Sequence, residues 1–141
     1  MVGAQRGRVK AAIVLALLGG CFWRSAGREA ATHVEVLTAI AHKGVDLVVA
    51  GRLTAESMPE LTYPLERAQA FAARWGDGAA PPWLDAFSDL LDRYRELVDA
   101  LDRVRREAKG DAAAAALREP LARVDAAAAA VRAALAVEGR R

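Results

Sequence analysis

The chain has few of the residues that mark many specialised proteins. Its 141 residues include one cysteine, two histidines, three tryptophans, two tyrosines and three phenylalanines. A single cysteine excludes a disulfide framework within the chain, which needs cysteines in pairs. β-Branched and aromatic residues form no alternating runs between turn residues, so no strand is predicted. Alanine, in contrast, makes up about a quarter of the sequence and is the best helix former. The composition therefore predicts an all-α protein with one domain.

The chain also has no excess of positive charge outside its first 20 residues. The full chain has 20 Lys and Arg against 18 Asp and Glu, a net charge of +2. Residues 1–20, however, contain Arg6, Arg8 and Lys10 and no acid, so residues 21–141 have 17 basic and 18 acidic residues, a net charge of −1. Nucleic-acid binding requires a concentrated basic surface. We therefore predict no nucleic-acid partner.

Residues 1–20 have the three parts of an export signal. The first ten residues are positively charged, residues 11–18 (AAIVLALL) are apolar, and two glycines precede Cys21. Counted as far as Trp23, the apolar stretch has 13 residues, whereas a helix needs about 20 to cross about 30 Å of hydrocarbon. We expect a cleaved leader rather than a membrane-spanning helix.

The sequence Leu18-Gly19-Gly20-Cys21 resembles the lipobox of bacterial lipoproteins: an aliphatic residue, two small residues and a cysteine. In that family a diacylglyceryl group is attached to the thiol, a dedicated peptidase cuts before the cysteine, and the new amino terminus often receives a fatty acid such as palmitate. Two or three acyl chains, at about 0.8 kcal/mol per buried methylene, form a stable membrane anchor.

This resemblance implies a signal peptide at 1–20, a lipid-anchored tether at 21–26 and a helical domain at 27–141. Phe22 follows the cysteine where an Asp would signal retention under the enterobacterial sorting rule. The absence of Asp implies the outer membrane, with the domain facing the periplasm. An ordinary secretory signal that leaves a free cysteine and an uncleaved signal anchor remain the alternatives.

Four helices are predicted in the mature chain. The first covers about residues 27–52, and Gly44 and Gly51 weaken its interior and its end. The second begins at Ser57 or Thr62, each followed by a proline in the first turn, and ends before the Gly76-Asp77-Gly78 stop signal.

The third and fourth helices carry apolar residues at alternating steps of four and three, the spacing of a heptad seam. Pro81-Pro82 opens the third helix, and Gly110-Asp111 separates it from the fourth. The seam keeps its phase across Pro120, which predicts one kinked helix. The seam residues are Trp83, Phe87, Leu90, Tyr94, Leu97, Leu101 and Val104 in the third helix, and Leu117, Leu121, Val124, Ala128, Val131 and Leu135 in the fourth.

The seams can be folded onto one another in register. A hairpin of the last two helices pairs Leu97 with Val124, and a hairpin of the second and third pairs Phe87 with Phe71. These registers predict an up-down four-helix bundle with heptad-like seams. A three-helix bundle with a loose first helix is the alternative.

Two features could serve binding. Phe71, Trp75, Trp83 and Phe87 gather near the turn between the second and third helices, where they either plug the end of the core, the interpretation we favour, or form a partner surface. Residues 126–131 contain no charged residue, so the first helix, a second copy or another envelope protein should cover them.

Residues for catalysis or metal binding are scarce. Glu35, His42 and Asp46 share one helical stripe, but only His42 and Asp46 have the i,i+4 spacing of a local pair, and a solvated ion pair is expected there. No catalytic set is recognised, and no enzyme activity, cofactor or metal is predicted. We expect a structural, adaptor or assembly component of the envelope. The alternative is a small periplasmic ligand- or metal-binding domain, with a cavity lined by His33, His42 or Glu35.

Overall fold

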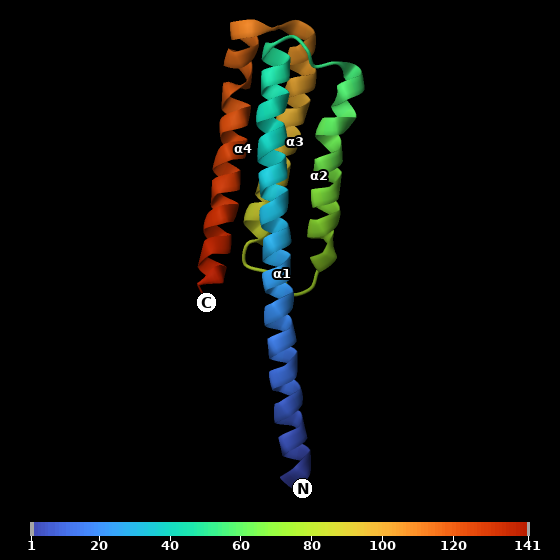
Figure 1. Cartoon of the computed structure of the whole chain (residues 1–141), viewed down its shortest axis with the longest axis vertical. Helices are drawn as coiled ribbons and strands as arrows, with labels where there is room; N and C mark the ends of the chain where they lie inside the picture. The colour runs from blue at the N-terminus through green and yellow to red at the C-terminus, as the bar shows by residue number, and fades with distance from the viewer. Residues whose placement is uncertain (1, 141) are drawn as a thin grey trace.

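The computed structural model describes the backbone of residues 2–140 and the side chains of residues 24–140. Consecutive helices run in opposite directions (Figure 1), so the predicted up-down four-helix bundle is confirmed. The predicted signal peptide and Cys21 lie outside the residues whose side chains are described. The elements are α1 (Val2–Val49), η1 (Ala55–Ser57), α2 (Met58–Ala72), η2 (Ala73–Trp75), α3 (Leu84–Glu107) and α4 (Gly110–Gly139), where η denotes a short 3-10 helix.

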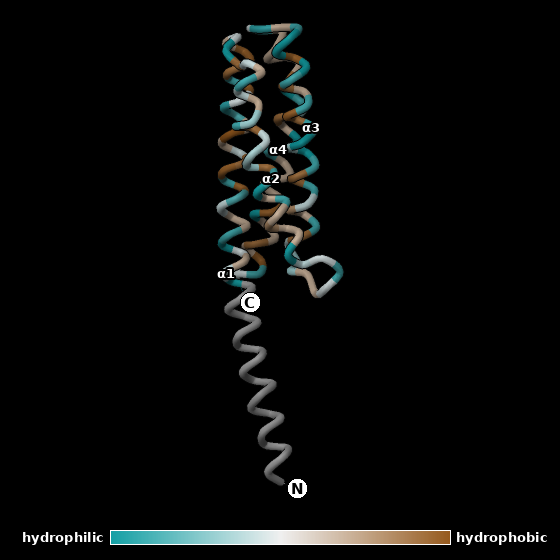
Figure 2. The backbone as a smooth tube through the Cα atoms, turned by 90° about the vertical axis from the view of Figure 1, so that its right-hand side faces the viewer, coloured by the Kyte–Doolittle hydropathy of each residue, from teal (hydrophilic) through white to brown (hydrophobic). Residues whose placement is uncertain are grey.

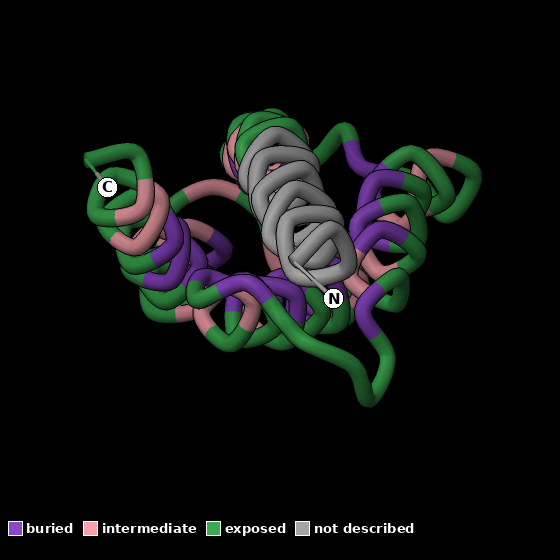
Figure 3. The backbone as a smooth tube through the Cα atoms, turned by 90° about the horizontal axis from the view of Figure 1, so that it is seen from below, coloured by how far each residue is buried: buried purple, intermediate pink, exposed green. Residues whose placement is uncertain are grey.

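Helix α1 packs against all three other helices, whereas α2 and α4 lie on opposite sides of the α1–α3 pair (Figures 1 and 3). A three-helix bundle with a loose first helix is therefore wrong. Among the described side chains, the packed part of α1 begins at Ala26, which is buried and belongs to the core. Ala26 is also the last residue of the segment 21–26 that we expect as a tether.

The end of α1 has a specific physical cause. Gly51 has a positive φ of 70°, a conformation that costs glycine nothing. Its N–H donates to the carbonyl of Val48 at 2.9 Å, and the N–H of Arg52 donates to the carbonyl of Leu47 at 2.8 Å. This pair of bonds is a Schellman motif, which satisfies the last carbonyls of a helix. The predicted stop near residue 52 is thus confirmed.

The other helix boundaries follow from prolines and glycines. Helix α2 begins after Ser57, the earlier of the two predicted starts, so Pro59 lies in its first turn and Pro64 lies inside it. The predicted cap is not formed, because the Ser57 side chain makes no hydrogen bond to the helix and its hydroxyl lies 2.9 Å from that of Thr54. Helix α4 is one continuous helix that includes Pro120. Two residues separate α3 from Gly110, which is the first residue of α4 and has a positive φ of 64°. This tight connection holds α3 and α4 side by side.

The core lies along α3. In Figure 2 hydrophobic and hydrophilic segments alternate along the helices, and in Figure 3 the buried segments face the interior. Leu97 and Val124, one of the predicted layers between α3 and α4, are both fully buried. Tyr94 is also buried, and its hydroxyl donates a 2.6 Å hydrogen bond to the carbonyl of Leu61. Burial raises the pKa of this phenol well above its usual range.

Gly44 lies where α1 comes close to two other helices. A Cβ atom at this position would lie 2.9 Å from Cδ1 of Leu101 and 3.4 Å from Cδ2 of Leu61. The glycine weakens α1 locally, but its missing side chain lets α1 pack closely against α2 and α3.

Candidate functional site

The four aromatic residues predicted to gather near the α2–α3 turn do form one cluster. The rings of Phe71 and Trp83 are parallel with centroids 5.9 Å apart, and Trp75 stands edge-on to both at 5.1 and 5.4 Å. Phe87 completes the cluster at 5.5 Å from Phe71. Offset and edge-to-face pairs of this kind stabilise a core beyond the area they bury.

All four rings are buried, Trp83 and Phe87 completely. The burial favours the end plug over the partner surface, because rings enclosed by their own chain present little area to another protein. Nε1 of Trp83 is buried with no hydrogen-bond partner among the described residues.

His42 does not form the pair that we expected within α1. Its Nε2 lies 2.9 Å from a carboxylate oxygen of Asp125 on α4, so it bridges two helices instead of pairing with Asp46. Both side chains are about half exposed, and exposed ion pairs typically contribute less than about 1 kcal/mol. The interaction therefore joins α1 and α4 at the surface and adds little to the apolar packing between them.

His33 is the more enclosed of the two histidines. Its ring lies 5.0 Å from that of Phe71 and 6.2 Å from that of Phe87, at the edge of the aromatic cluster. Burial holds the pKa of His33 below its usual value; nearby Arg67 and Arg74 act in the same direction, and Glu29 acts against them. The neutral ring thus serves as part of the apolar packing.

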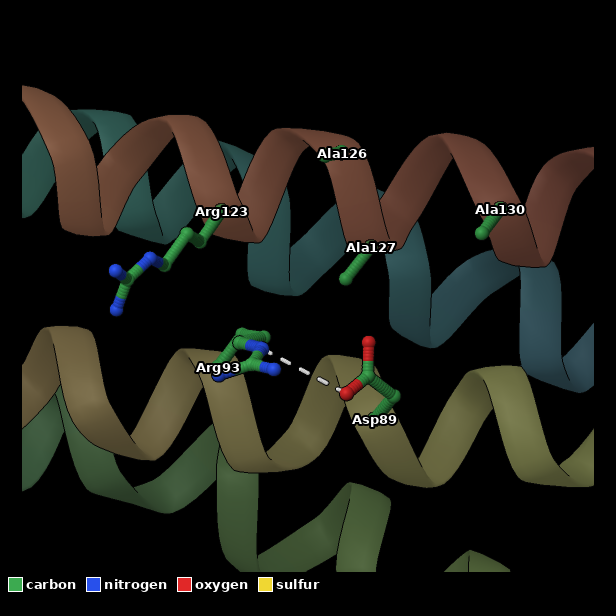
Figure 4. Close-up of a pocket in the computed structure, with 6 residues that line it drawn as sticks. All are labelled: Asp89, Arg93, Arg123, Ala126, Ala127 and Ala130. Carbon is green, nitrogen blue, oxygen red and sulfur yellow. Dashed lines mark ion pairs between the residues drawn. The ribbon is translucent and has the colours of Figure 1, made fainter.

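A shallow groove of about 480 Å³ runs between α3 and α4 (Figure 4). Its α4 side is formed by Arg123 and three alanines, and its α3 side by Asp89 and Arg93. Arg93 pairs with Asp89 at 3.6 Å and with Glu96 at 3.3 Å, and Arg123 pairs with Glu119 at 2.5 Å. Both cations already have carboxylate partners in their own chain, so the groove offers no strong anion site.

The outer face of α4 continues this groove. Part of the charge-free segment 126–131 is covered within the chain, since Ala127, Ala128 and Val131 are buried. The rest faces solvent, together with alanines before and after it, at alternating steps of four and three. The exposed alanine stripe consists of Ala122, Ala126, Ala129, Ala133 and Ala136.

A second pocket, of about 310 Å³, lies between α1 and the carboxyl end of α4. It forms beside Gly27, where a Cβ atom would lie 3.6 Å from Cδ2 of Leu135 and 4.0 Å from Oε2 of Glu138. The exposed Arg24 and Arg28 also line it. The sequence places these two arginines one helical turn apart, but it does not show that α4 ends beside them. The pocket was therefore not predicted from the sequence.

Neither pocket is lined by His33, His42 or Glu35, the residues named for a ligand-binding cavity. In the part of the chain whose side chains are described, no group of three His, Cys, Asp or Glu residues is placed to hold a metal ion. Within the same range, no helix is long and apolar enough to cross a membrane.

Comparison with models of known protein families, with curated protein sequences and with solved structures found no match.

Proposed function

We propose that this chain is a lipid-anchored helical protein of the bacterial cell envelope, facing the periplasm and acting as a structural, adaptor or assembly component. The observation that carries the proposal is the order of residues before α1 enters the bundle: a basic start, a short apolar stretch and Leu18-Gly19-Gly20-Cys21. In this proposal Cys21 is the lipidated first residue of the mature chain, and Phe22 in place of Asp favours the outer membrane.

The exposed alanine stripe of α4 supports the adaptor or assembly role. Its four-three spacing is the spacing with which one helix packs against another, and alanine side chains allow two helix axes to approach closely. In the proposed function, a helix of another envelope protein or of a second copy covers this stripe.

The anchor is tested by metabolic labelling with a radioactive fatty acid in a bacterial host. The wild-type chain should be labelled, and Cys21→Ser should lose the label and the mobility shift of processing. A matched control carries Cys21→Ser together with Ser25→Cys, which restores a thiol four residues further along. It should stay unlabelled, because the thiol no longer follows Leu18-Gly19-Gly20. Unchanged labelling of Cys21→Ser would refute the anchor.

The adaptor role is tested in intact envelopes with a photocrosslinking amino acid at Ala129, which faces solvent on α4. The control position is Asp99, which is exposed on α3. We expect one discrete adduct from position 129 and none from position 99. Equal adducts from both positions, or none from position 129, would argue against a partner helix on this face.

A further inference from the structure

The pocket between α1 and the end of α4 has a composition suited to an amphipathic anion. Ala31 and Leu135, both partly buried, contribute apolar lining, and exposed Arg24 and Arg28 contribute two guanidinium groups. Its volume of about 310 Å³ is at the lower end of the range for small-molecule sites. A phosphate next to a short apolar segment would match both kinds of lining.

The charges of the pocket are not balanced. Glu138 is the one acidic residue in its lining, against Arg24 and Arg28. Neither arginine forms an ion pair with a described residue, in contrast to Arg93 and Arg123 in the other groove. Like charges one turn apart disfavour a helix slightly, and a shared anion would remove that repulsion. Guanidinium groups bind phosphate oxygens in a bidentate manner.

The position of the pocket indicates the source of the anion. Arg24 is three residues after Cys21, and three residues span at most about 11 Å even when fully extended. The headgroup layer on each side of a bilayer is about 5 to 7 Å thick. The Cα–Cβ bonds of a helix tilt toward its amino terminus, so the side chains of Arg24 and Arg28 lean toward the end of the bundle that is nearest to Cys21.

We infer that this pocket binds the phosphodiester headgroup of a membrane phospholipid, with Arg24 and Arg28 as its phosphate ligands and Leu135 against the adjoining apolar part. The inference rests on the proposed lipid anchor, which brings the pocket to the membrane surface. The bound headgroup holds the carboxyl end of α4 at the bilayer and directs the rest of the bundle away from it.

The test uses the full chain with Cys21→Ser, made by cell-free synthesis so that no lipid is attached. Dihexanoyl phosphatidylglycerol, below its micelle concentration, is titrated while the NMR signals of the Leu135 methyl groups and of arginine Nε–Hε are followed. The probe should shift the Leu135 signals, and Arg24→Gln/Arg28→Gln should weaken its affinity about tenfold or more, because two charge-assisted contacts are lost.

The matched control is Arg103→Gln/Arg118→Gln, which removes the same charge from exposed positions of α3 and α4 and should leave the affinity unchanged. Equal weakening by both double variants, or by neither, overturns the inference. If inorganic phosphate binds as tightly as the lipid, the inference is overturned and the pocket is a free-phosphate site. If dihexanoylglycerol, which has no phosphate, binds as tightly as the lipid, the inference is also overturned and the pocket is only an apolar site. If fatty-acid labelling of Cys21 succeeds while the probe fails to bind, the anchor stands and this inference falls.

Discussion

Helices α3 and α4 share the same four-three spacing of buried residues but use it differently. Helix α3 buries large side chains such as Phe87, Tyr94 and Leu97, and its exposed positions are mostly charged. Helix α4 buries mainly alanine and valine, and its exposed face is again rich in alanine. The spacing of apolar residues decides which face of a helix is buried. The size of those side chains decides how much free energy is gained by burying that face instead of the opposite one.

The difference has an energetic basis. Burying a Leu or Phe side chain contributes about 1.5–3 kcal/mol, and a single methyl group contributes about 0.8 kcal/mol. The two faces of α4 therefore differ less in burial free energy than the two faces of α3. A helix of this kind suits packing on both sides, once within its own bundle and once against a partner.

The largest expected effect comes from truncating an α3 side chain. Phe87→Ala should lower the free energy of unfolding by about 3–5 kcal/mol, because it removes a fully buried ring and leaves a cavity. On α4, Val124→Ala should cost roughly 2 kcal/mol, since two methyl groups are lost. Urea unfolding followed by circular dichroism measures both. Equal losses of unfolding free energy in the two variants would contradict the proposed difference between α3 and α4.

A smaller effect separates the two faces of α4. Ala128 is fully buried and its neighbour Ala129 is exposed. Ala128→Leu should destabilise the bundle by about 1–3 kcal/mol through overpacking, and Ala129→Leu should change its stability by less than about 0.5 kcal/mol. The same unfolding experiment compares the two variants, each of which is the control for the other. A cost at position 129 equal to that at 128 would mean that the stripe is covered within the chain.

Much of the fold was predictable from the sequence because the residues that start and stop most of the helices lie next to the helix ends in the sequence. Gly51 ends α1, Pro59 lies in the first turn of α2 and Gly110 separates α3 from α4, so each of these boundaries follows from neighbouring residues. The start of α1 does not: the first helix was predicted from about residue 27, but α1 begins at Val2. The layers of α3 on α4 were predictable as well, since both seams keep one period across a two-residue connection.

Contacts that join distant parts of the chain were not predictable. His42 was expected to pair within α1 because Asp46 lies one turn away, but Asp125 of α4 is its partner. The pocket beside Gly27 depends on where α4 ends, 112 residues after it, and no local pattern encodes that distance. The predicted aromatic cluster was found, yet only the packed structure showed that its rings are buried.

The smallest expected effect concerns the two sides of α1, where His33 faces the aromatic rings of α2 and α3 and His42 faces α4. Burial holds the pKa of His33 below its ordinary value of 6.5, so the unfolded chain takes up a proton at a higher pH than the folded one. The stability that neutral His33 contributes is therefore complete above pH 6.5 and is lost as the pH falls from 6.5 through the folded pKa.

His33→Gln cannot be protonated and should flatten this dependence. Between pH 7 and pH 5 the Tm of the wild-type chain should fall by about 1–3 °C more than that of His33→Gln, measured by differential scanning calorimetry. The control is His42→Gln, on the side of α1 that faces α4. In this variant the part of the Tm decrease that is due to His33 should remain. A wild-type Tm that rises relative to His33→Gln on acidification would mean that Glu29 outweighs burial at His33, which would place the charged form of the ring in the bundle.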